Sequence, residues 1–228
     1  MDKADLPRVG KTDQPAGTPG GEDPVRERRA AVLRAAWSVF EAKGLEEASI
    51  RLIAQAAGMT TGAIYPYFSG KEEIYAELLR ESLERLHAEL SAAIGASRGR
   101  KKRFRIAIGM FFSYYEARPA ELSLALYLFR GLKPQGLTPQ LNRQLNAKAQ
   151  DILLLLRGVI QAISGLDGQT AAQEVGLQVT FLFGLLTIHH TRRSRMLGVK
   201  TGTLMALHVE QSIDRLAAGP IDGARRAI

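Results

Sequence analysis

One stretch of this sequence decides the fold: residues 49–68, SIRLIAQAAGMTTGAIYPYF. Ser49 is a good N-cap for a short helix that begins at Ile50, because its side-chain oxygen can accept a hydrogen bond from the first turn. Gly58 ends that helix, since glycine adopts the positive φ of a tight turn at little cost. The pattern therefore predicts a helix over Ile50 to Ala57 and a sharp turn after it.

A third and very short helix is expected after the turn. Thr60 can cap it, and it must end at or near Tyr65 because Pro66 disfavours helical geometry in the residue before it. Two short helices joined by such a turn indicate a helix-turn-helix. We assign this motif to residues Ser49 to Phe68.

The side chains of the motif divide into an inward set and an outward set. The inward set is apolar and can hold the two helices at a fixed angle: Ile50, Ile53, Met59 and Ile64. The outward set on the third helix is small or polar: Thr60, Thr61, Gly62, Ala63 and Tyr65. A helix with such a surface can enter the major groove of DNA, and its first N–H groups suit a phosphate.

Helical periodicity continues on both sides of the motif. Upstream, apolar residues from Val32 to Phe40 recur every three or four positions until Gly44. Downstream, Ser69 and Glu72 have the spacing of a capping box before a long helix, Lys71 to about Ile94. Further helices are expected over 102–117, 120–130, 139–164, 169–190 and 201–217. Because no stretch shows sustained apolar–polar alternation, the sequence predicts an all-α protein of about nine helices.

Composition limits the possible functions. The 228 residues include no cysteine, so disulfides, thiol nucleophiles and thiolate metal sites are excluded. A formal net charge of +8 favours polyanionic partners, nucleic acid first and an acidic membrane second. The N-terminus carries no apolar signal stretch, and the longest uncharged run, Val175 to Thr191, is shorter than a spanning helix. We therefore expect a cytoplasmic protein without a membrane segment.

Residues Arg51 to Ile74 resemble the signature of the TetR/AcrR family of transcriptional regulators. The shared pattern is Arg51-x-Ile53-Ala54-x-x-Ala57-Gly58-x-Thr60-x-Gly62-x-Ile64-Tyr65-x-Tyr67-Phe68-x-x-Lys71-Glu72-Glu73-Ile74. Three positions depart from the usual family pattern without undermining the fold. Leu52 stands where an acidic residue is frequent, Pro66 occupies a variable position, and Gly70 replaces the usual polar cap.

The resemblance implies a homodimer that binds a palindromic operator in double-stranded DNA and releases it when a small molecule enters the C-terminal domain. It also implies the organisation of the chain: a disordered tail (1–25), a helix-turn-helix domain (26–71), a ligand-binding and dimerisation domain (72–218) and a C-terminal tail (219–228). Carried over position by position, the expected DNA contacts are Arg51, Thr60, Thr61, Gly62, Ala63, Tyr65, Tyr67 and Lys71. Two of these residues have an alternative that is as good as a DNA contact. Thr60 can be a helix cap only, and the side chain of Lys71 can simply be solvated.

Beyond residue 75 the resemblance is architectural only. A small-residue stripe lies on a helix that is otherwise apolar nearly all round, and the last helix carries a second apolar stripe. In the family the last two long helices usually form the dimer interface. The expected interface residues are Gly176, Thr180, Gly184, Ile188, Met205 and Val209. The alternative is that these stripes pack inside the protomer.

The effector site is not identified by the sequence. Aromatic residues are spread over three expected helices, and most are expected to be core: Phe104, Phe111, Phe112, Tyr114, Tyr115, Tyr127, Phe129, Phe181 and Phe183. His189 and His190 are adjacent on a helix and diverge, which argues against a metal site. Since no acid–base pair or cofactor loop is found, we expect no catalysis, cofactor or metal. An activator, a regulator with a protein partner, and a helical enzyme or carrier are the alternatives.

Overall fold

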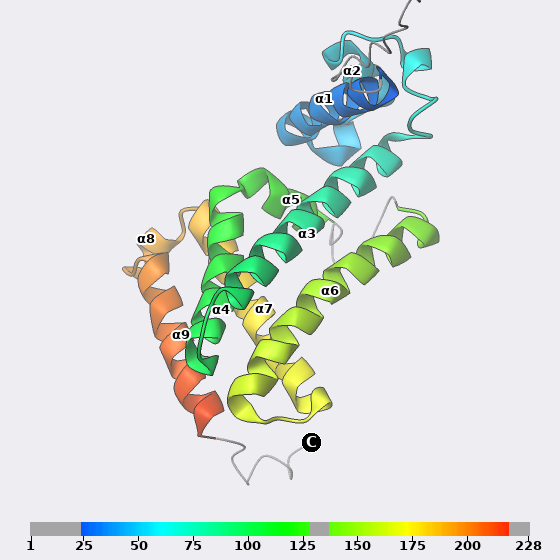
Figure 1. Ribbon diagram of the computed structural model, residues 1–228. Coiled ribbons are helices and arrows are strands. Elements are labelled where there is room, and N and C mark those ends of the chain that lie inside the picture. The colour runs from blue at the N-terminus through cyan, green and yellow to red at the C-terminus, as the bar shows by residue number, and fades with distance from the viewer. Residues whose placement is uncertain (1–23, 128–136, 219–228) are drawn as a thin grey trace, which may run out of the picture.

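The computed structural model describes residues 24–127 and 137–218, and all of the regular elements in these two ranges are helices. The elements are α1 (Pro24–Glu47), α2 (Ile50–Ala56), the 3-10 helix η1 (Thr61–Ala63), α3 (Lys71–Gly95), α4 (Arg100–Ala117), α5 (Pro119–Tyr127), α6 (Pro139–Ser164), α7 (Gly168–His190), α8 (Ser194–Leu197) and α9 (Thr201–Ala217). Figure 1 shows their order along the chain. The all-α prediction is confirmed.

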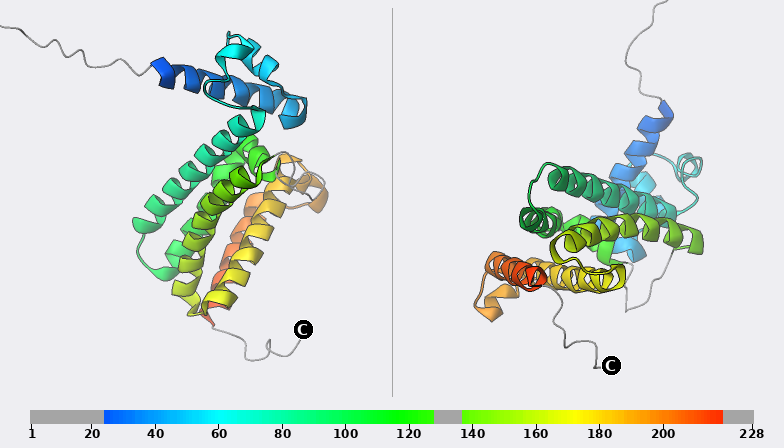
Figure 2. Two further views of the ribbon diagram at one scale, coloured as in Figure 1. Left: turned by 90° about the vertical axis from the view of Figure 1, so that its right-hand side faces the viewer. Right: turned by 60° about the horizontal axis from the view of Figure 1, so that its bottom comes forward.

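The molecule has two parts that share one long helix. α1, α2 and η1 pack together at one end, and α3 begins there and runs into a bundle formed with α4 to α9 (Figure 1). The left view of Figure 2 shows α3, α6, α7 and α9 with their axes roughly aligned, and α7 runs back toward the N-terminal part. The helix that follows the helix-turn-helix in sequence is therefore also a wall of the bundle.

The N-terminal part differs from the sequence prediction in three details. The sequence predicts that the first helix stops at Gly44, and α1 does lose helical geometry there, with a φ of +71° and a ψ of 173°. The difference is that helical turns resume after Gly44 and continue to Glu47. The third helix is only the 3-10 turn Thr61–Ala63 followed by further turns, because Gly62 and Pro66 both weaken a regular α-helix. The capping box is shifted by one residue: Gly70 is the N-cap of α3, and the Ser69 amide and hydroxyl both donate to the Glu73 carboxylate at 2.7 Å.

The C-terminal part contains one helix that the sequence did not indicate. The single turn α8 follows Arg192, whose φ of +57° lies in the left-handed region, and it separates α7 from α9. The expected helix over 120–130 is described as far as Tyr127, and its last residues lie outside the described ranges. The two predicted tails also fall almost entirely outside them.

The centre of the bundle is aliphatic and aromatic. Leu86 and Leu90 of α3, Phe104 of α4, Ile160 of α6 and Leu182 of α7 are all fully buried. Each such side chain contributes roughly 1.5–3 kcal/mol of hydrophobic stabilisation. The bundle is therefore a firm support against which α3 is fixed along its length.

α7 and α9 lie side by side at one edge of the bundle, as both views of Figure 2 show. By length and composition alone, α7 could span a membrane. The helix is longer than the uncharged run Val175 to Thr191 considered in the sequence, because it already begins at Gly168. Its inner face packs on α4, α6 and α9 and includes Val175, Leu182 and Leu186. Its apolar character is thus partly explained by the core of this protein.

The outer face of α7 carries the predicted small-residue stripe. Gly176, Thr180 and Gly184 are exposed, Ile188 is half-buried, and Leu177 beside them is 62% exposed. On α9 the expectation needs correction, because Met205 and Val209 are each only 7% exposed and pack inside their own protomer. The stripe on α9 is the inward face of an amphipathic helix, and Leu207, 52% exposed, lies on its outer face instead.

Candidate nucleic-acid interface

The turn between α2 and η1 is built by backbone hydrogen bonds around one glycine. Ser49 Oγ accepts from the amide of Leu52 at 3.2 Å and caps α2. Gly58 has a φ of +66°, and the amide of Met59 after it donates to the carbonyl of Ala54 at 2.9 Å. An L-amino acid with a side chain rarely adopts this φ, so Gly58 allows the chain to leave α2 and start η1 within a few residues.

The inner side of the motif is held by side chains that are almost completely buried. Ile53 and Ile64 are 0% exposed, Ala54 is 2% exposed, and Phe68 is 2% exposed. They belong to the same core as α1 and the start of α3. Because side chains in such a core cannot shift independently, the outer surface of η1 is fixed in direction relative to α1 and α3.

The predicted DNA contacts lie on the outer surface of the motif. Arg51, Thr60, Thr61, Gly62, Ala63 and Tyr65 are exposed, while Tyr67 and Lys71 are half-buried. Tyr65 has 58% of its surface exposed, which is unusual for a large aromatic residue in a folded protein. Thr60 makes no side-chain capping hydrogen bond to η1, contrary to its expected capping role. Six of the eight sequence-predicted residues are therefore accessible at the surface of the motif.

Lys71 has a structural contact that the sequence did not indicate. Its Nζ donates to the backbone carbonyl of Ala48 at 2.9 Å, which ties the first turn of α3 to the end of α1. The side chain therefore supports the motif from behind. An ammonium group has three donors, so this contact is compatible with a phosphate on the outer side.

Arg29 joins the motif to α3 and was also missed. Its guanidinium lies 5.1 Å from the ring centre of Phe68 and forms a charged hydrogen bond with Glu77. Arg29 and Glu77 are 48 residues apart. No local spacing in the sequence indicates such a pair, so only the fold reveals it.

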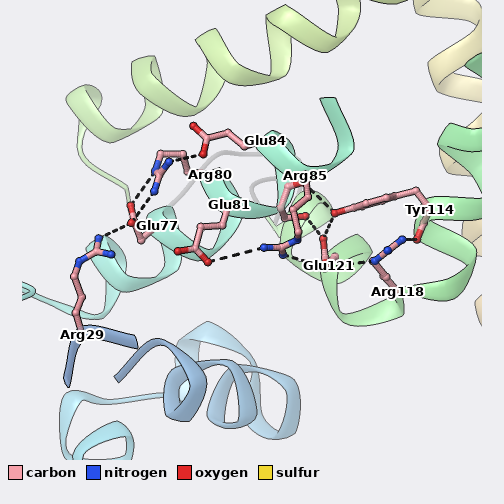
Figure 3. Close-up of polar contacts among 10 residues, drawn as sticks. Arg29, Glu77, Arg80, Glu81, Glu84, Arg85, Tyr114, Arg118 and Glu121 are labelled. Carbon is pink, nitrogen blue, oxygen red and sulfur yellow. Dashed lines mark hydrogen bonds and ion pairs between the residues drawn. The ribbon is translucent and has the colours of Figure 1, made fainter. Parts of the chain in front are cut away.

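Glu77 belongs to a chain of ion pairs that extends from α1 to α6. Figure 3 shows its members on α1 and α3. Arg80 contacts Glu77 in a bidentate manner, with N–O distances of 2.8 and 2.9 Å, and contacts Glu84 at 2.6 Å. Lys148 of α6 lies 3.1 Å from the other oxygen of Glu84. The Arg80 and Arg29 guanidiniums hold the pKa of Glu77 below its ordinary value, although partial burial acts in the opposite direction. The carboxylates of Glu77 and Glu84 are thus shared among three cations: Arg29, Arg80 and Lys148.

A second polar cluster fixes the junction of α3, α4 and α5 (Figure 3). The carboxylate of Glu121 is buried and accepts hydrogen bonds from Ser82 and Tyr114, and Arg85 lies 3.1 Å away. Burial raises the pKa of Glu121, but the two hydroxyl donors and the Arg85 charge outweigh it, and the net shift is downward. Arg118 covers the Tyr114 ring at 4.2 Å.

The bundle contains a partly open apolar cavity of about 250 Å³. Its walls come from α3 to α7 and include Leu79, Leu83, Leu86, Phe111, Tyr115 and Phe183. None of the side chains that line it is charged, and Asn146 is the one amide among them. Burial raises the pKa of Tyr115, so its phenol is neutral.

The two adjacent histidines contact different elements. His189 Nδ1 lies 2.9 Å from the Thr201 hydroxyl, and His190 Nε2 lies 3.0 Å from the carbonyl of Tyr115. In the described ranges, no group of three or more potential metal-ligating side chains was found. The divergent pair therefore connects α7 to α9 and to α4.

A short helix-turn-helix with an exposed polar face, followed by a helical bundle with an apolar pocket, is an arrangement suited to DNA binding and ligand binding in one chain. Residues 32–78 match the family described as bacterial regulatory proteins, tetR family. This match covers the helix-turn-helix and the start of α3, so the N-terminal part of the chain is similar to these regulators.

Two curated relatives illustrate the range of functions in the family. The transcriptional repressor KstR2 of Mycobacterium tuberculosis is 33% identical over 93 residues, which are 41% of this chain and 45% of the relative. The transcriptional activator FasR of Mycolicibacterium smegmatis is 32% identical over 97 residues, 42% of this chain and 44% of the relative. The chain thus aligns with somewhat less than half the length of these relatives. Both are regulators of transcription, not enzymes.

The similarity to solved structures extends over both parts of the molecule. The regulator FadR of Bacillus subtilis, solved in complex with stearoyl-CoA, has a TM-score of 0.62 and 21% sequence identity. The alignment covers 84% of this chain and 98% of FadR. At this identity the match concerns the fold.

Proposed function

We propose that this protein is a repressor that binds a palindromic operator as a homodimer and releases it when a small apolar molecule enters the bundle. The observation that carries the proposal is the exposed face from Thr60 to Tyr65 on a firmly packed helix-turn-helix. Such a face suits the major groove, and a dimer places two of them about 34 Å apart, one turn of DNA. A repressor of this kind acts in the cytoplasm, where the DNA is.

The two hydroxyl-bearing residues on this face have separate roles in the proposal. Thr61 at the start of η1 and Tyr65 after it present donors and acceptors to base edges or phosphates. Ala63 between them offers only a methyl group, which suits the methyl group of a thymine. Arg51 on α2 and Lys71 at the start of α3 supply positive charge for the flanking phosphates.

The effector site in the proposal is the apolar cavity among α3 to α7. Because the lining is uncharged, it favours an uncharged hydrocarbon body over a charged group. The FadR complex supports this reading, since a similar fold there accommodates a molecule with a long acyl chain. Leu79, Leu83 and Leu86 lie on α3, so an effector that fills the cavity contacts the helix that leads to the DNA-binding surface.

The choice of repressor over activator rests on the same geometry. A ligand that displaces α3 moves the two recognition surfaces of a dimer relative to each other, and this weakens binding to successive grooves. The activator FasR shows that a region similar to part of this chain also occurs in a protein that activates transcription. A reporter gene downstream of the operator distinguishes the two: deletion of the regulator raises expression if the protein represses.

The DNA-binding proposal is tested by fluorescence anisotropy on fragments from the region upstream of the protein's own gene. We expect binding to one palindromic fragment at least about a thousandfold tighter than to random DNA, and affinity that falls steeply with salt. Tyr65→Ala is expected to abolish selective binding, while Met196→Ala, an 85% exposed residue on α8, leaves it unchanged. Equal affinity for random DNA, or an unfolded Tyr65→Ala variant by circular dichroism, contradicts the proposed role of this face.

A further inference from the structure

A second cavity lies between the two parts of the molecule, outside the bundle. It is a cleft of about 360 Å³ with walls from α1, the start of α3 and the start of α5. α5 is the element of the bundle that lies beneath α1 (Figure 1). None of the side chains that line the apolar cavity of the bundle borders this cleft. It is therefore a separate space at the domain junction.

Aromatic rings form much of the cleft. Phe40 and Tyr75 contact each other edge to face, with ring centres 6.1 Å apart, and Trp37 lies on the same side of α1. The Tyr75 hydroxyl donates to the backbone carbonyl of Leu124, so the floor of the cleft is attached to α5. Pro119 and Leu124 complete an apolar wall. The shape is thus supported by contacts among its own residues.

Glu41 is the one charged side chain that lines the cleft. It is exposed, and within the described residues no ion pair to it is found. The end of the regular part of α1 and the start of α5 both border the cleft, and the partial charges of these helix ends have opposite sign and largely offset each other. The carboxylate of Glu41 therefore sets the sign of the local charge.

Aromatic faces beside an unpaired carboxylate form the environment that suits an organic cation. The π-electrons of tryptophan attract a positive charge most strongly among the aromatic residues, and tyrosine and phenylalanine also contribute. An anion is repelled by Glu41, and a neutral molecule gains only the apolar contacts. A cleft of about 360 Å³ is large enough for one phenyl ring with a substituted ammonium group.

We propose that the cleft between α1 and α5 is a binding site for a compact organic cation with an apolar body. The aromatic rings of Trp37 and Phe40 contact the apolar body and the ammonium group, and Glu41 supplies the counter-charge. A ligand there touches the DNA-binding part through α1 and the bundle through α5, so it opposes relative movement of the two parts. This second site requires neither operator binding nor an effector in the bundle.

The protein contains a single tryptophan, and it lines the proposed site. Titration of the full chain with benzyltrimethylammonium is therefore expected to change tryptophan fluorescence in a saturable way. Benzyl alcohol and phenylacetate, which carry the same ring with no charge and with a negative charge, are expected to bind much more weakly. A linear change without saturation, or equal responses to the three probes, overturns the proposal.

Two variants assign the binding to this cleft. Glu41→Gln is expected to weaken binding of the cation about fivefold, which corresponds to about 1 kcal/mol, and to leave the response to benzyl alcohol unchanged. Ala120→Leu fills the cleft from α5 and is expected to abolish saturable binding, whereas Ala117→Leu, exposed at the end of α4, retains it.

The second variant also separates this cleft from a neighbouring one. Trp37 borders another groove on its other side, between α1 and α3, which Ala120 does not line. Saturable binding that persists in a folded Ala120→Leu variant therefore places the cation elsewhere and overturns the proposal. None of these measurements uses DNA, so their failure is distinguishable from a failure of the proposed repressor function.

Discussion

Glu121 illustrates how one buried carboxylate fixes a junction of helices. It lies on α5, its hydrogen-bond donors Ser82 and Tyr114 lie on α3 and α4, and Arg85 provides the balancing charge. A buried ion is costly unless it is paired and hydrogen-bonded, and here both conditions are met. The sequence showed only a glutamate in the first turn of a short helix, since its hydrogen-bond partners are 7 to 39 residues away and only Arg118, in a looser ion pair at 3.9 Å, is local.

We predict that Glu121→Gln lowers the free energy of unfolding by about 2 kcal/mol at neutral pH, because Arg85 loses its buried counter-charge. The folded-state pKa of Glu121 lies below the ordinary value of 4.5, so its stabilisation is complete above about pH 4.5 and is lost as the pH falls through the folded-state value. Urea unfolding at several pH values measures this. The difference in free energy of unfolding between the wild type and Glu121→Gln is expected to become smaller at acid pH.

The matched control is Glu210→Gln, because Glu210 is exposed and pairs only with exposed Arg105. Its urea midpoint at neutral pH is expected to equal that of the wild type. If the Glu121→Gln difference stays constant down to strongly acid pH, the stabilisation does not come from the ionised carboxylate.

At the scale of elements, α3 presents two different faces. Leu79, Leu83 and Leu86 border the apolar cavity, whereas Glu77 and Glu84 hold the ion-pair chain from α1 to α6. Partly exposed ion pairs contribute little individually, about 0.2–1 kcal/mol each. Their significance here is geometric, because they link α1 of the N-terminal part to two helices of the bundle, α3 and α6.

We predict that Glu77→Gln loosens the joint between α1 and α3. Arg29 loses its charged partner and Arg80 keeps only Glu84, so hydrogen exchange is expected to accelerate in the segment from Phe68 to Ile74, with little change in the core of the bundle. Hydrogen-exchange mass spectrometry measures this directly. Glu81→Gln is the control, since the ion pair of Glu81 is with Arg85 of the same helix, at 4.0 Å. Equal exchange in both variants would show that Glu77 does not hold the joint.

The elements were largely predictable because helical periodicity and caps are local signals. Ser49, Gly58 and Pro66 define the helix-turn-helix from neighbouring residues alone. The exposed contact face followed from the same spacing. The Arg29–Glu77 pair was missed because its residues are 48 positions apart. The Ser69–Glu73 contact and α8 after the positive φ of Arg192 are local, but they differ from the usual capping spacing and from the usual backbone angle of a residue other than glycine.

At the scale of the whole molecule, periodicity predicts that a face is buried without identifying what buries it. Met205 and Val209 form a stripe as regular as that of Gly176, Thr180 and Gly184, yet the first faces the protomer's own core and the second faces outward. The proposed dimer contact is therefore the outer face of α7 together with Leu207 of α9. Close approach of two α7 helices is possible there because the stripe is made of small side chains.

We predict that Gly184→Trp converts the dimer to a monomer. No atom lies within 4 Å of a Cβ added at Gly184, so the protomer tolerates the larger side chain while a partner helix does not. Size-exclusion chromatography with light scattering measures the mass. Gly158→Trp on α6 is the control, since Gly158 is equally unobstructed and exposed but lies on another helix, and its dimer is expected to persist. A dimeric Gly184→Trp variant rules out this contact.

The separation of the two faces of α3 has a consequence for how such a protein can diverge. Substitutions at Leu79, Leu83 or Leu86 alter the size and shape of the cavity, and with them the compound that fits. None of these residues takes part in the ion-pair chain through Glu77 and Glu84. The ligand preference of the cavity can therefore change during evolution while the ion-pair chain that joins α1, α3 and α6 stays the same.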